Sequence, residues 1–271
     1  MNCCYIFTYN ISTEEYKGYY SNLLFKSIET LLMFYDKDIE NIYILIDNQI
    51  DLNYYKDFQK SINKINNNRV NIIYKLIDLN ITNCIKYPEN NENFYKINKI
   101  GLLKFFIPYL VDCKNILYID CDILFNQNIK DDIYKEYNQE ETLIKIYQYG
   151  WNSGLILFNC DIWRKENNLL SDIIDFYNNY DSNTKADNYK LVDNNSFNWL
   201  SRLSCYCNKC IKDSNYKINF PINIPEIWYK EFNIPIDFTW ENMNILHICG
   251  NFDDKIIFND IYNYIIDNYD K

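Results

Sequence analysis

Short apolar runs alternate with longer segments of helical spacing through the first half of the chain. The apolar runs CCYIFT, NIYILI, VNIIYKLI and NILYI, at residues 3–8, 41–46, 70–77 and 115–119, are typical of buried strands. Helical spacing occupies the intervening segments, within residues 13–35, within residues 53–65 and from Phe94 to about Val111; in the first of these the apolar positions are Tyr20, Leu23, Leu24, Ile28, Leu31 and Leu32. Strands that alternate with helices predict βαβ units and a parallel sheet, so we expect an α/β fold.

The second half of the chain is less regular. We expect a strand at 154–159 (GLILFN), helices from Asp161 to about Tyr180 and from Asp193 to Leu203, and, after a polar link and the segment NILHICG, a closing helix near 256–268. No internal repeat or low-complexity linker divides the sequence, which predicts a single domain over residues 1–271. The asymmetry favours a nucleotide-binding first half, residues 1–125, and a second half, residues 126–271, that completes a cleft.

Composition excludes several classes of partner. The formal net charge is -10 and Lys and Arg form no dense cluster, which argues against nucleic acid or anionic lipid. The start MNCCYIFTYN lacks a signal-peptide pattern and the longest uncharged apolar runs are too short to cross a bilayer, so we expect a cytoplasmic protein without a transmembrane segment. The ten cysteines are then expected to be reduced thiols. Three of them, in CYCNKC, leave a zinc site open as an alternative: Cys205, Cys207 and Cys210.

The run NILYIDCDILF ends in two carboxylates, Asp120 and Asp122, one residue apart. Spacing alone does not define a site, because Asp36 and Asp38 have the same spacing in the polar link YDKDIE. Open parallel sheets, however, bind ligands at the carboxyl ends of their strands, and paired carboxylates there favour Mg²⁺ or Mn²⁺. A divalent ion that bridges a diphosphate is one reading of the pair; a helix cap or a solvated strand end is the other.

A second cluster of candidate ligands lies near the end of the chain, in HICGNFDDK. The only histidine, His247, is a suitable Mn²⁺ ligand, although a lone histidine is more often structural. Gly250 permits close approach of the backbone to a phosphate, and Lys255 can neutralise it. Together with the carboxylate pair, these residues predict a clamp for a diphosphate.

Four blocks, in order, resemble glycosyltransferase family 8, the retaining GT-A enzymes that include glycogenin and lipopolysaccharide galactosyl- and glucosyltransferases. The segment LLKFFIPYLVDCKNILYIDCDILF is similar to the family's helix, proline turn and DxD-bearing strand. The other three blocks are WNSGLILFNCDIWRKEN, DNNSFN and HICGNFDDK. The resemblance implies a GT-A fold, with a Rossmann-like mixed central sheet flanked by helices and a DxD motif at a strand end.

The resemblance also assigns roles to individual residues. The motif Asp120-Cys121-Asp122 would contact the donor diphosphate through Mn²⁺, with Mg²⁺ as the other candidate, and the metal ligands would be Asp120, Asp122 and His247. Further donor contacts would come from Thr8, Asn10, Tyr16, Lys104, Gly250 and Lys255. The catalytic, sugar-facing residues would be Asn152, Asp193 and Asn194. Asn194 replaces the family's usual Gln, and Asn195 replaces a frequent Asp, so this edge keeps its amides but loses a charge.

The function implied is retaining transfer of a hexose, with glucose favoured over galactose or N-acetylglucosamine, from a UDP-sugar to a hydroxyl of a glycan, a lipid-linked sugar or a protein. Two routes to retention stay open, front-face attack by the acceptor and a covalent intermediate on Asp193, of which we favour the first. Self-glycosylation on one of the 27 tyrosines, as in glycogenin, and a homodimer are further expectations. The alternative from another class is a catalytically silent protein that binds a sugar nucleotide.

Overall fold

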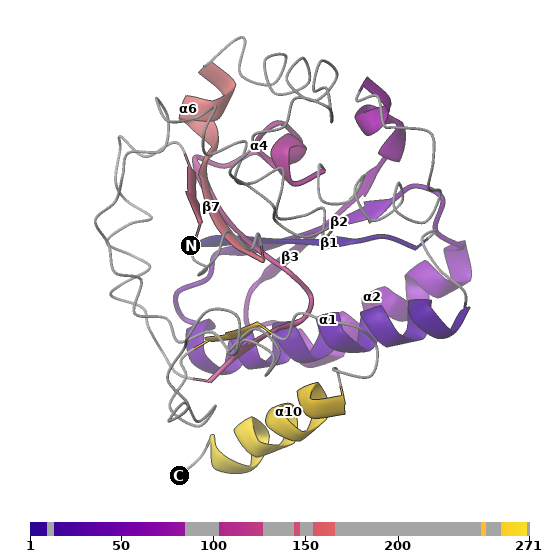
Figure 1. The fold of residues 1–271 in the computed structure, drawn as a ribbon, viewed down its shortest axis with the longest axis vertical. Helices are drawn as coiled ribbons and strands as arrows, with labels where there is room; N and C mark the ends of the chain where they lie inside the picture. Colours follow the sequence, from indigo (N-terminus) through magenta and orange to yellow (C-terminus); the bar gives the residue numbers. More distant parts are fainter. Residues whose placement is uncertain are drawn as a thin grey trace, which may run out of the picture.

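The computed structural model describes residues 1–9, 14–84, 103–126, 144–146, 154–165, 245–247 and 256–269. Within these ranges, six strands form one sheet in the order β3-β2-β1-β4-β7-β6 (Figure 1). Their bounds are β1 Asn2–Phe7, β2 Asn41–Asp47, β3 Asn71–Ile77, β4 Asn115–Ile119, β6 Ile144–Ile146 and β7 Leu155–Asn159. The helices are α1 Glu14–Tyr35, α2 Leu52–Asn66, α4 Ile107–Leu110, α6 Cys160–Lys165 and α10 Ile256–Asn268, with 3₁₀ turns η1 Leu79–Cys84 and η2 Lys104–Phe106.

The sheet is mixed, and its parallel part contains a change of winding direction. β1 pairs in parallel with both β2 and β4, whereas β7 is antiparallel to β4. The chain winds outward from β1 to β3 and then returns to place β4 on the other side of β1. In open α/β sheets this point of reversal opens a crevice at the carboxyl ends of the two strands. The expected α/β fold with a mixed central sheet is confirmed.

The central strands are buried on both faces, which explains why they are almost continuously apolar. Side chains alternate along each strand. One face carries Cys4, Ile6, Ile116 and Tyr118 into a core with α4 and α6. The opposite face carries Cys3, Tyr5, Phe7, Leu117 and Ile119 into a core with α1 and α2.

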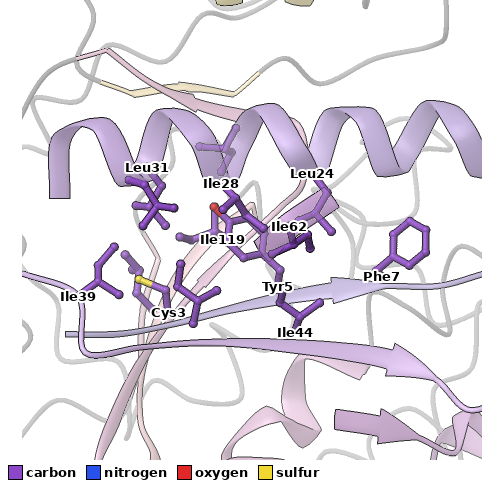
Figure 2. Close-up of a cluster of buried hydrophobic side chains, with 14 of the residues drawn as sticks. Cys3, Tyr5, Phe7, Leu24, Ile28, Leu31, Ile39, Ile44, Ile62 and Ile119 are labelled. Atoms are coloured by element: carbon purple, nitrogen blue, oxygen red, sulfur yellow. The ribbon is translucent and has the colours of Figure 1, made fainter. Parts of the chain in front are cut away.

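Helix α1 covers the second of these cores. Leu24, Ile28 and Leu31 point from the helix toward the side chains of β1 and β2 (Figure 2). The predicted helical positions Leu23, Leu24, Ile28, Leu31 and Leu32 are buried, but Tyr20 is 37% exposed and packs its ring edge-on against Tyr19. Burial of each aliphatic side chain of this stripe contributes about 1.5–3 kcal/mol.

The helix expected from Phe94 to about Val111 is interrupted where the structure describes it. The segment from Leu103 onward consists of the 3₁₀ turn η2 and the single-turn helix α4, with Pro108 in its first turn. Proline has no N–H to donate to the carbonyl of Lys104 four residues back; instead Ile107 N donates to that carbonyl in a 3₁₀ bond. The part of the expected helix before Leu103 lies outside the described residues.

A two-stranded antiparallel sheet joins distant parts of the chain. β5 (Ile123–Phe125) directly follows the Asp120–Asp122 turn and pairs with β8 (Ile245–His247). Helix α10 packs beside it through Phe258, Ile261 and Ile265, which contact Leu23 of α1 and Leu124 of β5. The closing helix expected over 256–268 is confirmed. None of the described helices combines the length and the hydropathy needed to span a bilayer.

Candidate functional site

The two carboxylates of NILYIDCDILF lie in a turn at the carboxyl end of β4. Ile123 N donates to Asp120 O at 3.3 Å and closes the turn, and Asp120 N donates to Gly154 O at 2.7 Å, just before β7. Both backbone polar groups of Asp120 are therefore hydrogen-bonded, the carbonyl within the turn and the N–H to the residue before β7. Since β1 and β4 are adjacent and parallel, Thr8, which follows β1, lies at the same edge of the sheet.

The pair Asp36 and Asp38 lies at the other edge. These residues form the turn between α1 and β2, where Asp38 N donates to Tyr35 O at 2.9 Å. They precede a strand, whereas Asp120 follows one, and parallel strands place those two situations at opposite ends of the sheet. The identical spacing therefore has different surroundings, and Asp36 and Asp38 provide an internal control.

Lys104 and Tyr118 both bind the Asp120 carboxylate. Lys104 Nζ lies 3.0 Å from Asp120 Oδ1 and 3.3 Å from Oδ2. The lysine side chain is only 7% exposed and that of Asp120 is 24% exposed, so the pair is largely shielded from water. The ammonium also lies 4.8 Å from the centre of the Tyr118 ring, within the range of a cation–π interaction.

Tyr118 is a site residue that the sequence reasoning missed. Its hydroxyl donates a hydrogen bond to Asp120 Oδ1. Burial raises the pKa of Tyr118 well above its ordinary value, and the Asp120 charge raises it further, so the phenol remains a hydrogen-bond donor. A signal was present in the sequence, because residues two apart on a strand share a face, which places a tyrosine beside the first carboxylate of the pair.

Asp47, at the end of β2, was also missed. Its fully buried carboxylate accepts hydrogen bonds from Tyr9 N and, at 3.1 Å, from Gln49 N. The first contact ties the segment that follows β1 to the end of β2, next to Thr8. Asp47 ends an apolar run, NIYILID, just as Asp120 follows NILYI, and that similarity was the available signal.

We expect Asp47→Asn to lower the free energy of unfolding by about 2 kcal/mol, because an amide offers one acceptor oxygen where two backbone N–H groups are bound. Urea denaturation followed by circular dichroism measures the change. Asp78→Asn is the matched control: Asp78 also follows a strand and accepts from an N–H two residues on, Asn80 N at 2.9 Å, but it is exposed. Equal losses in the two variants would contradict a special role for Asp47.

His247 is brought next to the carboxylate turn by strand pairing. In the register of β5 and β8, His247 lies opposite Ile123, the residue that follows Asp122. Its backbone is thus close to the predicted metal pair, although 124 residues separate them in sequence; its side chain lies outside what the structure describes. Among the described residues, no three His, Cys, Asp or Glu side chains form a cluster that could hold a metal ion.

The structure does not describe the side chains of the other predicted site residues. Tyr16 lies in α1, and its side chain is not described. The remaining predicted positions lie outside the described residues: Asn10, Asn152, Asp193, Asn194, Gly250 and Lys255, together with the cysteines of CYCNKC. The structure therefore brings together the strand-end part of the predicted site: Thr8, Lys104, Asp120, Cys121, Asp122 and the backbone of His247.

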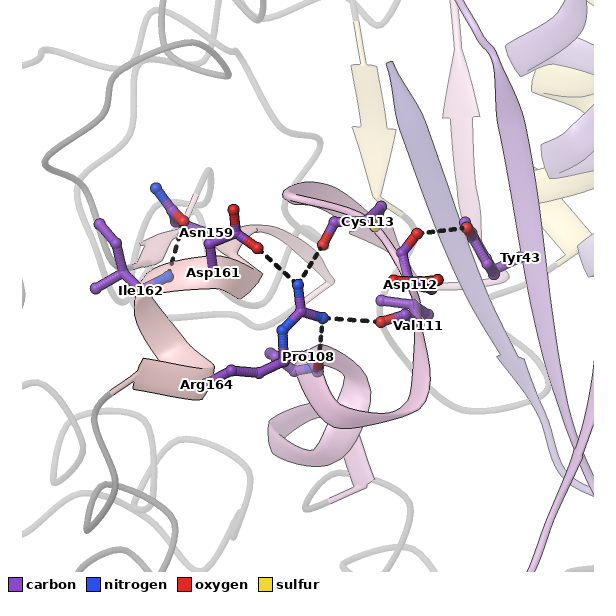
Figure 3. A network of polar contacts seen from close by, with 9 residues as sticks. All are labelled: Tyr43, Pro108, Val111, Asp112, Cys113, Asn159, Asp161, Ile162 and Arg164. Carbon is purple, nitrogen blue, oxygen red and sulfur yellow. Dashed lines mark hydrogen bonds and ion pairs between the residues drawn. The ribbon is translucent and has the colours of Figure 1, made fainter.

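The segment that carries Lys104 is anchored by one arginine. Arg164 of α6 donates to the carbonyls of Pro108, Val111 and Cys113, each at 2.9 Å (Figure 3). Its Nη2 also lies 2.7 Å from Asp161 Oδ1. These bonds satisfy carbonyls at the end of α4 and in the link to β4, and so fix the start of the strand that leads to Asp120.

No family model matches the chain. The glycosyltransferase GlyA of Streptococcus pneumoniae serotype 4 (strain ATCC BAA-334 / TIGR4) is 29% identical over an alignment that covers 38% of this chain. That alignment spans 16% of the length of GlyA.

Solved structures of three glycosyltransferases are similar over nearly the whole chain. Apo mouse xyloside xylosyltransferase 1 has a TM-score of 0.58 at 12% identity and covers 94% of this chain and 99% of its own. The glycosyltransferase GlyE of Streptococcus pneumoniae TIGR4 has a TM-score of 0.56 at 14% identity, and the match covers 99% of this chain and 62% of GlyE. The galactosyltransferase LgtC, in complex with donor and acceptor sugar analogs, has a TM-score of 0.52 at 13% identity, and the match covers 97% of this chain and 96% of LgtC.

The chain has the GT-A glycosyltransferase fold. The chain is thus similar to a glycosyltransferase in sequence over part of its length and to glycosyltransferases in fold over nearly all of it, in agreement with the resemblance that the motifs indicated. In the GT-A fold of this protein, the carboxylate turn after β4 and the end of β1 flank the point at which the sheet changes its winding direction.

Proposed function

We propose that the protein is a glycosyltransferase that moves a hexose from a UDP-sugar to a hydroxyl acceptor with retention of configuration and in dependence on Mn²⁺. The observation that carries the proposal is the Asp120-Cys121-Asp122 turn, which lies at the winding reversal of a GT-A fold and next to the strand that bears His247. Glucose is the favoured sugar, and the similarity to a galactosyltransferase keeps galactose as the second candidate.

The residues present suit a hard divalent cation. Asp120 and Asp122 would supply carboxylate oxygens from a turn with a hydrogen-bonded backbone, and His247, whose backbone lies on the adjacent strand, would supply an imidazole. When bound there, the ion supplies a Lewis acid that stabilises negative charge on the leaving diphosphate.

The protein's own groups account for the other requirements of transfer. Cleavage of the bond between the anomeric carbon and the phosphate oxygen builds negative charge on the diphosphate, which Lys104 and Lys255 are suited to offset electrostatically. Asn152, Asp193 and Asn194 are proposed to face the sugar. We favour attack by the acceptor hydroxyl from the same face as the leaving group, with a phosphate oxygen accepting the acceptor's proton.

Release of UDP from a panel of UDP-sugars, in Mn²⁺ and then in EDTA, tests this proposal. We expect release with at least one hexose donor in Mn²⁺ and none in EDTA, and intact-mass measurement of the same samples reports any hexose added to the protein itself. Asp36→Ala, in the pair at the opposite edge of the sheet, should behave as wild type.

The second candidate function is a catalytically silent binder of sugar nucleotides, which the replacement of the family's usual Gln and Asp by Asn194 and Asn195 favours. Calorimetric titration of the same UDP-sugars, beside the assay of UDP release, separates the two. Tight binding of a UDP-sugar without release of UDP from any donor would support the binder and contradict the transferase.

A further inference from the structure

We propose that Lys104 is a resident cation of the donor site: its ammonium neutralises Asp120 while the site holds no donor, and it moves to the diphosphate when a divalent ion takes the carboxylate. This inference rests on the proposed function and adds a role for Lys104 in coupling metal and donor binding. It predicts that Lys104 opposes metal binding alone and supports nucleotide binding.

The contacts of Lys104 support its role as the cation that neutralises Asp120. Its Nζ lies within 3.3 Å of both oxygens of the Asp120 carboxylate, and its side chain is 7% exposed. The ring of Tyr118 lies 4.8 Å from the same nitrogen, and its hydroxyl is bound to the same carboxylate. The ammonium therefore lies directly beside the two oxygens that a metal ion would bind.

Charge repulsion supports the proposed movement of Lys104 to the diphosphate. A divalent ion on Asp120 would lie a few ångströms from the Lys104 charge, and two cations at that separation in a shielded site repel each other strongly. A shielded ammonium is stabilised by a close anion, because a buried charge is costly unless it is well paired, so Lys104 favours an anion that approaches the site. The diphosphate of a bound donor is the anion that arrives together with the metal.

The chain offers reasons to expect that Lys104 can move without unfolding its surroundings. It begins the 3₁₀ turn η2, which is followed by a proline-containing helix, so that its backbone is held while its four-carbon side chain keeps several rotatable bonds. A lysine is suited to this exchange, because its ammonium is a point charge whose three donors need no fixed planar geometry.

The test is the effect of Lys104→Met on two separate affinities. Electron paramagnetic resonance of free Mn²⁺ gives the Mn²⁺ affinity without nucleotide, over a titration that extends into the millimolar range. Calorimetry gives the affinity for UDP in saturating Mn²⁺. We expect Mn²⁺ to bind the variant on the order of tenfold more tightly than wild type, since a repelling charge is gone. UDP should bind on the order of tenfold more weakly, since a charged contact to phosphate is lost.

Opposite changes in the two affinities distinguish this role from a structural one, because general damage to the site would weaken both. Lys104→Arg keeps the positive charge and should not tighten Mn²⁺ binding. Lys75→Met is the matched control: Lys75 is also a partly buried lysine, but its ammonium donates to Leu110 O at 2.8 Å on the β3 side of the sheet, and neither affinity should change.

Two results would overturn the inference, and they differ in what else they affect. Unchanged or weaker Mn²⁺ binding by Lys104→Met, with normal binding of Mn²⁺ and UDP by wild type, would overturn the role of Lys104 alone. Absence of Mn²⁺ binding by wild type even with UDP would overturn both this inference and the metal dependence in the proposed function. If Lys104→Met is too unstable to titrate, Lys104→Gln, which keeps a polar side chain, is measured in its place.

Discussion

Replacing Asp120 by asparagine is expected to lower the rate of UDP release from the preferred UDP-sugar at least ~100-fold, a loss typical of removing a group that stabilises charge in the transition state. Asparagine preserves the size of the side chain and one oxygen for the Tyr118 hydroxyl, but it removes the charge that holds Lys104 and that a divalent ion requires. Steady-state assays of UDP release at saturating Mn²⁺ measure the effect.

Asp36→Asn provides the control for this prediction. It removes one carboxylate from a pair with the same spacing, in the turn that precedes β2 rather than in the turn that follows β4. We expect the activity of Asp36→Asn to remain within about twofold of wild type, since the effects of distant substitutions near the surface are usually small. Activity of Asp120→Asn close to that of wild type would show that the β4 turn is not the donor site.

Replacing Arg164 by methionine is expected to lower the free energy of unfolding by about 3 kcal/mol, because three backbone carbonyls lose a charged hydrogen-bond donor at once. The side chain of Arg164 is 31% exposed, so solvent moderates the loss below the sum of the separate bonds. The substitution also loosens the link between α4 and β4, which leads to Asp120. We therefore expect a fall in UDP affinity as well, smaller in free energy than the loss of stability. Urea denaturation gives the stability difference.

The pair formed by Lys60 and Asp57 supplies the matched control. It has the same i,i+3 spacing on a helix as Arg164 and Asp161, with Lys60 Nζ 3.3 Å from Asp57 Oδ1, but both side chains are largely exposed. Lys60→Met should change stability by no more than ~0.5 kcal/mol. A similar small change in Arg164→Met would mean that its contacts with Pro108, Val111 and Cys113 contribute little.

The regular part of the fold could be predicted from the sequence, and the reason is burial on both faces. The strands β1, β2 and β4 are buried, nearly continuous apolar runs, and α1 carries a helical stripe from Leu23 to Leu32, so local pattern and tertiary packing agree. The winding order was less accessible, because the reversal that brings β4 beside β1 depends on contacts between segments more than 100 residues apart.

The parts that could not be predicted depend on short or long-range interactions. β5 and β8 are three residues each, too short to show a period, and their pairing is what places His247 opposite Ile123. The 3₁₀ turn before Pro108 replaces part of an expected helix, because one missing N–H changes the local hydrogen bonding. The contact between Lys104 and Asp120 joins residues 16 apart, and only the fold brings them together.

The roles of individual carboxylates required both levels. The sequence identified Asp120 and Asp122 but could not separate them from Asp36 and Asp38 by spacing. The structure separates them by position, since the first pair follows β4 at the winding reversal and the second precedes β2.

Calorimetric titration of UDP with and without Mn²⁺, into wild type and into Asp122→Ala, shows whether the turn after β4 is a metal-dependent nucleotide site. We expect wild type to bind UDP at least ~10-fold more tightly in Mn²⁺ than in EDTA, and we expect Asp122→Ala to lose this difference while Asp36→Ala keeps it, in line with the usual effect of disturbing a metal site. Equal affinity for UDP in Mn²⁺ and EDTA, or an unchanged metal effect in Asp122→Ala, would contradict it.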